Sequence, residues 1–143
     1  MISCNLQGGL GNQMFQIAAA HALALRHNDT AGFNLDRCHT PLQGNPSFFY
    51  KTGIFKNIQD IKDYKFKNLY TEVSFCYKPI CHKPDLCLTG FFQSEKYFVD
   101  YKKEILELFH IQKEHIDIIK NEIDFSQNIT SVHIRRGDYV PKQ

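Results

Sequence analysis

Apolar and polar positions in the first 36 residues predict a strand, a helix and a second strand. Residues 2–6 form a short, mostly apolar run that predicts a strand, and residues 14–27, rich in Ala and Leu with few polar positions, predict a helix. A helix that is apolar nearly all round is buried, so we expect it to pack against a sheet. Residues 31–36 predict the second strand. This order, with glycines before the helix, is typical of the start of an α/β nucleotide-binding domain.

The remainder of the chain predicts fewer regular elements. Residues 40–49, rich in Pro, Gly, Asn and Ser, predict a loop, and the aromatics and lysines from there to Tyr77 follow no clean period. Four segments predict regular structure: a strand ending in a turn at 86–92, helices at 101–109 and 113–123, and a final strand at 129–135. A parallel strand needs a crossover of a dozen or more residues. Only eight residues follow Arg135, so we expect the chain to be the front part of a larger protein.

Composition excludes several classes of protein. The chain has 143 residues, of which 43% are apolar and 22% charged, as in one modest globular domain rather than a disordered or fibrous chain. Its net charge of +2 gives no general attraction to nucleic acid. No apolar run approaches the roughly 20 residues of a membrane span, and no secretory signal is visible. We therefore expect a cytoplasmic protein and leave open a peripheral contact with the inner face of the membrane.

The glycines at 8–11 are the first candidate for chemistry. They lie between a predicted strand and helix, where the backbone can turn sharply and the helix amides can bind an anion. No Gly-Lys-Ser/Thr follows, which excludes a Walker A loop. A dinucleotide fingerprint fits at Gly9, Gly11 and Asp36, but Met14 occupies the third glycine position. A glycine-lined turn without a ligand remains an alternative.

The second candidate is the arginine-containing segment at 133–138. Strand alternation predicts His133 and Arg135 on one face, and Arg136 lies at the end of the strand, where open α/β sheets bind ligands. The planar guanidinium forms paired hydrogen bonds to phosphate and keeps its charge. Asp138 could orient an arginine or accept a hydrogen bond from a ribose. Taken alone, a solvated surface cluster is at least as good an interpretation.

Two further clusters favour structural roles. Three thiols and an imidazole lie between Cys76 and Cys87, but the Cys-x2-Cys knuckle of a zinc site is absent, so we interpret them as core thiols. The segment 88–98 contains four aromatic residues that we expect to pack mainly in the core. Its only carboxylate is that of Glu95, so no acid–base pair is indicated there.

Three segments together resemble the α-1,2-fucosyltransferase family: GGLGNQMFQ at 8–16, LTGFFQSEKYF at 88–98 and HIRRGDY at 133–139. The resemblance covers the whole chain but only about the first half of a family member. It implies a GT-B fold, in which two Rossmann-like domains face each other across a cleft. Residues 1–125 would form the N-terminal, acceptor-side domain, and residues 126–143 would begin the domain that binds GDP-fucose.

The resemblance also implies a reaction, in which fucose passes from GDP-fucose to the 2-hydroxyl of a terminal galactose with inversion and without a metal or other cofactor. Arg135 would stabilise the leaving GDP, and the catalytic base stays open among His133, Glu95 and Asp138. The donor site would comprise Arg135, Arg136, His133, Asp138, Gly8, Gly9, Gly11, Asn12 and Gln13. The implied partners are GDP-fucose and a galactose-terminated glycan, with no nucleic acid. Residues 1–143 alone are expected to be inactive.

Two other functions remain as alternatives. A fragment of a nicotinamide-dependent oxidoreductase would use Gly9, Gly11 and Asp36, and a titration with NAD against GDP distinguishes it. The second alternative is a non-catalytic α/β binding module. Whether the natural reading frame stops at Gln143 distinguishes this alternative.

Overall fold

The structure is a computed structural model that describes residues 1–36, 45–109, 111, 113–124, 126–132 and 134. It divides into two units, Met1–His110 and Ile111–Gln143. The domain boundary expected after residue 125 stays a prediction.

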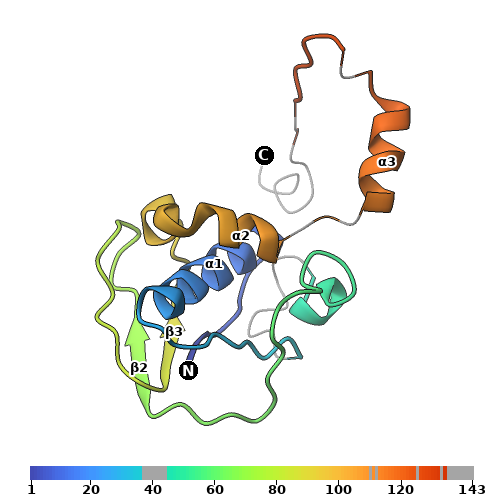
Figure 1. Cartoon of the computed structure of the whole chain (residues 1–143). Coiled ribbons are helices and arrows are strands. Elements are labelled where there is room, and N and C mark those ends of the chain that lie inside the picture. The colour runs from blue at the N-terminus through green and yellow to red at the C-terminus, as the bar shows by residue number, and fades with distance from the viewer. Residues whose placement is uncertain (37–44, 110, 112, 125, 133, 135–143) are drawn as a thin grey trace, which may run out of the picture. The chain divides into compact units, whose positions relative to one another are not determined.

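A small parallel sheet organises the first unit (Figure 1). Its strands are β1 (Ile2–Cys4), β2 (Asn68–Thr71) and β3 (Leu86–Thr89), and β3 lies between the other two. Parallel bridges join Ile2 to Ala31 and Phe33 to Asp60, which extends the sheet beyond β1. All strands run the same way, so their ends lie along two edges. We call these the carboxyl edge, where the strands end, and the amino edge, where they begin.

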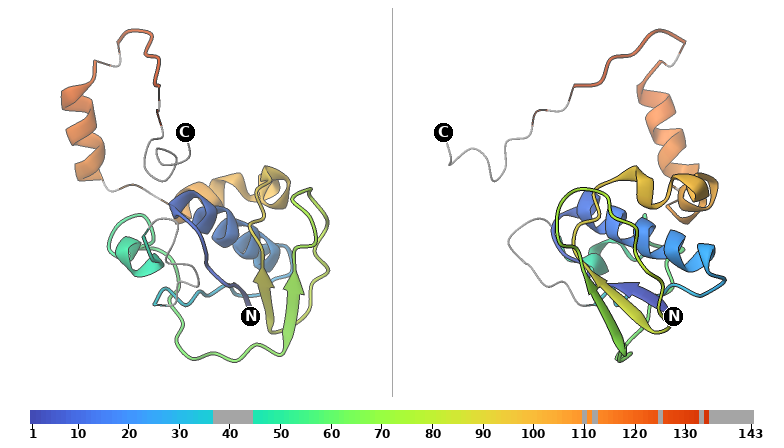
Figure 2. Two further views of the ribbon diagram at one scale, coloured as in Figure 1. Left: turned by 180° about the vertical axis from the view of Figure 1, so that it is seen from behind. Right: turned by 90° about the vertical axis from the view of Figure 1, so that its left-hand side faces the viewer.

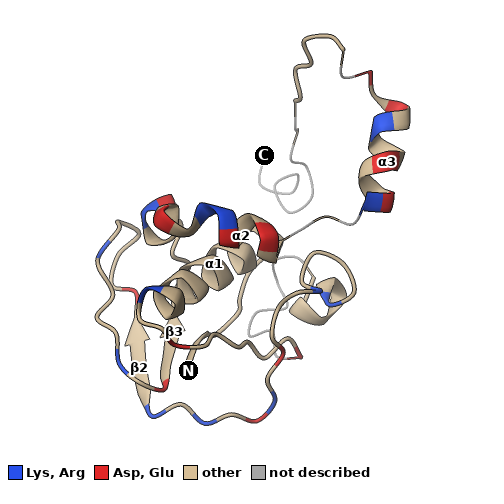
Figure 3. Ribbon diagram, viewed as in Figure 1, with Lys and Arg blue, Asp and Glu red and all other residues tan. Residues whose placement is uncertain are grey.

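The helix α1 (Leu10–Arg26) covers one face of this sheet. Ile17, Ala20 and Leu23 are almost completely buried and belong to the same apolar cluster as Ile2. Its sole charged residue is Arg26, and Figure 3 shows the rest of the helix free of charge. The prediction of a buried apolar helix against a sheet is therefore confirmed, and the α/β fold class with it.

A second helix, α2 (Lys102–Leu108), packs on the side of α1 that faces away from the sheet (Figure 2). It follows the short 3-10 helices η2 (Glu95–Tyr97) and η3 (Val99–Tyr101), which also contact α1. The helix predicted at 101–109 is confirmed. Its Ile105 is the residue that is buried.

Several expected boundaries differ from the structure. The helix predicted from residue 14 begins at Leu10, because Gly9 takes the extended N-cap conformation and its carbonyl already accepts from the Gln13 N–H at 3.1 Å. The strand predicted at 31–36 is reduced to single bridges. Within the predicted loop 40–49, Pro46 starts the 3-10 helix η1 (Ser47–Tyr50), so that part of the prediction is wrong.

The second unit contains the helix α3 (Lys113–Glu122), as predicted. The strand predicted at 129–135 is not found: residues 129–132 and 134 have no strand conformation. A strand needs a neighbouring strand for its hydrogen bonds, and the described residues of this unit supply none. His133 and Arg135 lie outside the described residues.

Candidate functional site at the carboxyl edge

The glycine loop joins β1 to α1 at the carboxyl edge, and its glycines have different reasons to be there. Gly8 has φ +75°, a backbone conformation that favours glycine, and a Cβ at this position would also force the Asn12 side chain to shift. Gly11 lies in the first turn of α1, where a Cβ would meet no atom of the described residues within 4 Å. Glycine lowers helix stability relative to alanine. Packing therefore does not explain Gly11, whereas the close approach of a ligand would.

Two buried glutamine amides hold this loop from inside. The Gln16 side chain accepts from the Gln7 backbone N–H at 3.0 Å and donates to the Gln7 carbonyl at 3.2 Å. Gln13 donates through Nε2 to the carbonyls of Gly8 at 2.8 Å and Asn45 at 3.0 Å. Both side chains are fully buried. Gln13 thus supports the loop from below, and its expected contact with a donor stays a prediction.

Hydrogen bonds connect the glycine loop to the turn after β3. Gln93 donates to the Asn12 side-chain oxygen at 2.6 Å, and Gln7 donates to the Gly90 carbonyl at 3.4 Å. These contacts bring together two of the three segments that carried the family resemblance, which are about 80 residues apart in the chain. The predicted site residues Gly8, Gly9, Gly11, Asn12 and Gln13 therefore share the carboxyl edge with the aromatic segment 88–98.

Glu72 is a component of this edge that the sequence did not indicate. It follows β2, and its carboxylate accepts the backbone N–H of Phe91 at 2.7 Å and that of Phe92 at 3.1 Å. Phe92 has φ +52°, a rare conformation for a bulky residue, and its side chain is fully buried. Glu72 thereby fixes a strained turn. Only the pairing of β2 with β3 places it there, because the sequence around β2 shows no clear periodicity.

A cavity of about 300 Å³ opens at the same edge. It is lined by Gln7, Thr71, Glu72, Val73, Ser74, Phe75, Thr89, Gly90 and Phe91. The rings of Phe75 and Phe91 stack with their centroids 6.3 Å apart. Phe92 and Tyr97 are buried, as expected for core aromatics, but Phe91 is only half-buried.

The remaining predicted donor and catalytic residues are His133, Arg135, Arg136 and Asp138, and they lie outside the described residues. Their roles stay predictions. Glu95, another candidate base, is exposed at the start of η2 and does not line the cavity.

The described cysteines fall into two pairs. Cys4 and Cys87 are buried, and burial raises the pKa of both thiols, that of Cys87 to about 11. Cys76 and Cys81 are exposed, so their interpretation as core thiols is wrong. They lie in a segment after β2 that contains prolines and has no regular structure, which leaves them in solvent.

Among the described residues, no group of three or more His, Cys, Asp or Glu side chains is arranged to hold a metal ion.

Asp36, the acid of the alternative dinucleotide fingerprint, forms ion pairs with two lysines. Its carboxylate accepts from Lys51 Nζ at 2.6 Å and forms an ion pair with Lys62 Nζ at 3.2 Å. These two hydrogen bonds lower the pKa of Asp36. The carboxylate oxygens that would bind a ribose are thus bound to side chains of this chain.

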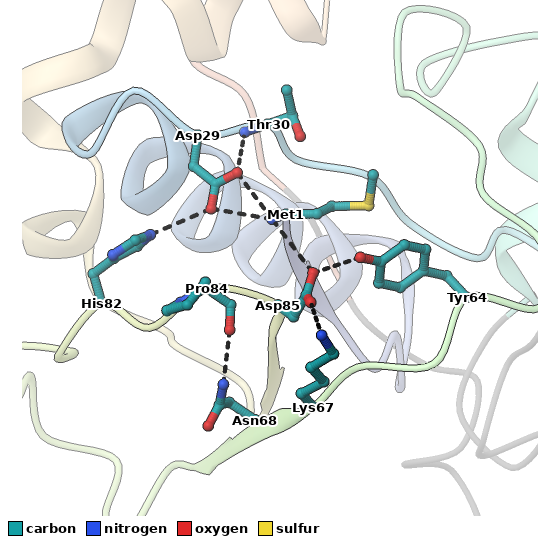
Figure 4. Close-up of polar contacts among 9 residues, drawn as sticks. All are labelled: Met1, Asp29, Thr30, Tyr64, Lys67, Asn68, His82, Pro84 and Asp85. Carbon is teal, nitrogen blue, oxygen red and sulfur yellow. Dashed lines mark hydrogen bonds and ion pairs between the residues drawn. The ribbon is translucent and has the colours of Figure 1, made fainter.

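A second polar cluster lies at the amino edge (Figure 4). The N-terminal ammonium of Met1 pairs with Asp29 at 2.9 Å and lies 3.9 Å from Asp85. His82 contacts the same Asp29 carboxylate at 3.3 Å, and its ring stacks on that of His27. These groups tie the start of β1 to the connections before its neighbours. The contacts are satisfied within the chain, which makes the cluster structural.

No helix in the described parts of the chain is long and apolar enough to cross a membrane.

Comparison with known proteins identifies relatives along the whole chain. The profile of the family described as Glycosyl transferase family 11 matches residues 1–143. An alpha-1,2-colitosyltransferase from Escherichia coli is 29% identical over 170 aligned positions, covering 98% of this chain and 56% of the relative. The O-antigen biosynthesis glycosyltransferase WbnK from Escherichia coli is 30% identical over 183 positions, covering 98% of this chain and 60% of the relative. No solved structure matches the chain. The chain thus spans a little over half the length of these relatives.

Proposed function

Since this chain belongs to glycosyl transferase family 11, we propose that it forms the front part of an inverting α-1,2-fucosyltransferase. The family match confirms the resemblance read from three sequence segments. In the proposed reaction, the 2-hydroxyl oxygen of a terminal galactose attacks the anomeric carbon of GDP-fucose. The bond from that carbon to the GDP oxygen breaks, the electron pair leaves with GDP, and the hydroxyl proton passes to a base.

The contact between the glycine loop and the Gly90 turn carries this proposal. It joins two family segments at the carboxyl edge of a parallel sheet, which is where open α/β folds bind their ligands. No atom of the described residues lies within 4 Å of a Cβ at Gly11, and the amides of this first turn of α1 provide partial positive charge for a phosphate. We place the donor diphosphate near this turn, and the roles of Arg135 and Arg136 in the donor site stay as the family resemblance implies them.

The donor sugar is best proposed as a 6-deoxy-L-hexose. Fucose follows from the family resemblance. Because one relative is an alpha-1,2-colitosyltransferase, colitose, which lacks the 3-hydroxyl of fucose, is a second donor worth testing. The reaction is proposed to need no metal, since arginines would stabilise the charge on the leaving GDP. We keep the cytosolic location expected from the sequence as part of the proposal.

An oxidoreductase is disfavoured. The third position of the dinucleotide fingerprint is Met14, and the Asp36 carboxylate is bound by Lys51 and Lys62.

The test uses the protein expressed from its natural coding sequence, with GDP-fucose or GDP-colitose as donor and lactose as acceptor, and mass spectrometry of the product. We expect a fucosylated trisaccharide whose linkage is α-1,2, and equal rates with and without EDTA.

Arg135→Ala should lower kcat/KM about a hundredfold or more, because the leaving group loses its charge stabilisation. Exposed Lys103→Ala serves as the control for loss of a positive charge. Turnover that survives Arg135→Ala would remove the leaving-group role. No transfer from either donor would refute the proposed reaction.

A further inference from the structure

We propose that the cavity at the carboxyl edge is an acceptor subsite that binds a pyranose ring, with Phe75 and Phe91 as its apolar wall. The kind of sugar, a galactoside, rests on the proposed function. The site itself rests on the cavity of about 300 Å³ and on the side chains that line it. Gln7 belongs both to this cavity and to the loop before α1, so the subsite adjoins the proposed donor position.

The aromatic wall is exposed in a way that calls for a partner. The side chain of Phe75 is 75% exposed, and its ring lies at 24° to that of the half-buried Phe91. Large apolar rings in water are unfavourable unless something covers them. A pyranose ring has a face of C–H groups that packs on an aromatic ring, while its hydroxyls point outwards to polar groups.

Polar groups that match those hydroxyls surround the aromatic wall. Thr71, Glu72 and Thr89 line the cavity together with Gln7. A carboxylate has about four lone-pair positions, and the two N–H groups bound by Glu72 leave acceptor capacity for a sugar hydroxyl. Ser74 also lines the cavity, but its hydroxyl oxygen is buried and has no hydrogen-bond partner among the described residues, so it is not counted among these groups.

The charge of the lining favours a neutral polyol over a nucleotide or phosphate. The described residues around this cavity include no Lys, Arg or His, and the one ionisable group among the polar ones named above is the Glu72 carboxylate. Such a site repels phosphate and accepts hydrogen bonds from hydroxyls. The anion-binding features of the edge lie instead at the first turn of α1.

The backbone keeps the aromatic wall in place. Phe92 is fully buried with φ +52°. The Glu72 carboxylate accepts hydrogen bonds from the backbone N–H groups of Phe91 and Phe92. Strain of this kind persists where surrounding contacts over-determine it, and it gathers at binding sites. Here the anchored Phe92 leaves Phe91 beside the cavity rather than in the core.

The experiment compares Phe75→Ala with Leu69→Ala in the protein expressed from its natural coding sequence. Leu69 is a matched control, because it is an exposed apolar residue on β2 that does not line the cavity. We expect Phe75→Ala to raise the KM for lactose about tenfold, as loss of a stacking contact would. The KM for GDP-fucose and kcat should stay near wild type, and Leu69→Ala should leave all three unchanged.

A second measurement does not depend on turnover. Saturation-transfer NMR with methyl β-D-galactopyranoside, without donor, should show transfer to the ring C–H protons in the wild type and in Leu69→Ala. Phe75→Ala should abolish this transfer. If Phe75→Ala changes neither the NMR transfer nor the acceptor KM, the proposal is wrong, and another part of the protein covers the ring. If no variant transfers fucose, the proposed function fails, while the NMR result still decides whether the cavity binds a sugar.

Discussion

The two edges of the parallel sheet differ in the contacts that hold their connecting loops. At the amino edge, the Met1 ammonium pairs with the carboxylates of Asp29 and Asp85, and His82 contacts the Asp29 carboxylate (Figure 4). At the carboxyl edge, the neutral amides of the buried glutamines hold backbone groups of the glycine loop. A single carboxylate, Glu72, does the same for the turn after β3.

The two kinds of contact differ in how much they stabilise the loops. Ion pairs that remain partly in solvent contribute little each, because water and salt screen them. A buried amide is different, since its loss leaves backbone donors and acceptors unpaired in a site that water does not reach. The carboxyl-edge loops are therefore held from inside by buried amides, and the proposed ligand would contact their outer side.

The largest expected effect comes from removing a buried amide at the carboxyl edge. Gln16→Met keeps the size of the side chain but leaves the Gln7 N–H and carbonyl without their partner. We expect a loss of about 2–3 kcal/mol in the free energy of unfolding, measured by urea denaturation of the full chain. Gln93→Met removes an exposed hydrogen bond and is the control, with an expected loss below about 0.5 kcal/mol. Equal losses in the two variants would contradict the role given to Gln16.

An intermediate effect distinguishes two glycines of the same loop. Gly8→Ala places a methyl group against Asn12 in a backbone with φ +75°, so we expect a loss of about 1–2 kcal/mol. The Gly11→Ala methyl group meets no atom of the described residues and alanine has the higher helix propensity, so stability should rise by up to about 1 kcal/mol. If Gly11 leaves room for the donor, Gly11→Ala should nevertheless raise the KM for GDP-fucose. A stable Gly11→Ala protein with unchanged KM would mean that no ligand approaches this turn.

The smallest effect is expected at the amino edge. Asp29→Asn weakens its contacts with the Met1 ammonium and His82, and we expect a loss of about 1 kcal/mol or less. Lys67→Ala is the control for an outer ion pair: its ammonium lies 3.8 Å from Asp85 and is 82% exposed, so no measurable change is expected.

The contribution of Asp29 should depend on pH. Desolvation alone would raise the pKa of this carboxyl, but hydrogen bonds from the Met1 ammonium, Thr30 and His82 outweigh it and lower the pKa. The Asp29 carboxyl thus loses its proton more readily in the folded state than in the unfolded state, where its pKa is about 3.9. The stabilisation by ionised Asp29 is therefore complete above about pH 3.9. It is lost as the pH falls through the lower pKa that the Asp29 carboxyl has in the folded state. The difference between wild type and Asp29→Asn should shrink from pH 6 towards about pH 2. A constant difference would show that Asp29 acts through packing alone.

Local patterning was sufficient for the main elements. The mostly apolar stretch after the glycines predicted the buried helix α1, and the helical pattern at 101–109 predicted α2. At 129–135 apolar alternation indicated a strand, but the described residues of that range, 129–132 and 134, form none. A helix makes its own hydrogen bonds, whereas a strand depends on a neighbour that local sequence does not specify.

The candidate site was predictable only in its separate pieces. The glycine loop and the aromatic segment 88–98 were recognisable one by one, from their residue types and from the family resemblance. Glu72 was not, because a lone carboxylate in an aperiodic stretch carries no signal until β2 pairs with β3. Gln13 was identified as a donor contact, but its burial beneath the loop depends on how the chain passes over it at Asn45.

The sequence by itself determined the family, the α/β class and the position of the glycine loop before an apolar helix, because these depend on residue types at short spacing. Only the tertiary structure decided which segments meet at the carboxyl edge. The Asn12–Gln93 contact, the strained turn fixed by Glu72 and the Phe75–Phe91 wall all join residues far apart in the chain. Such contacts follow from strand order and register, which are set by packing of the whole sheet rather than by any local pattern.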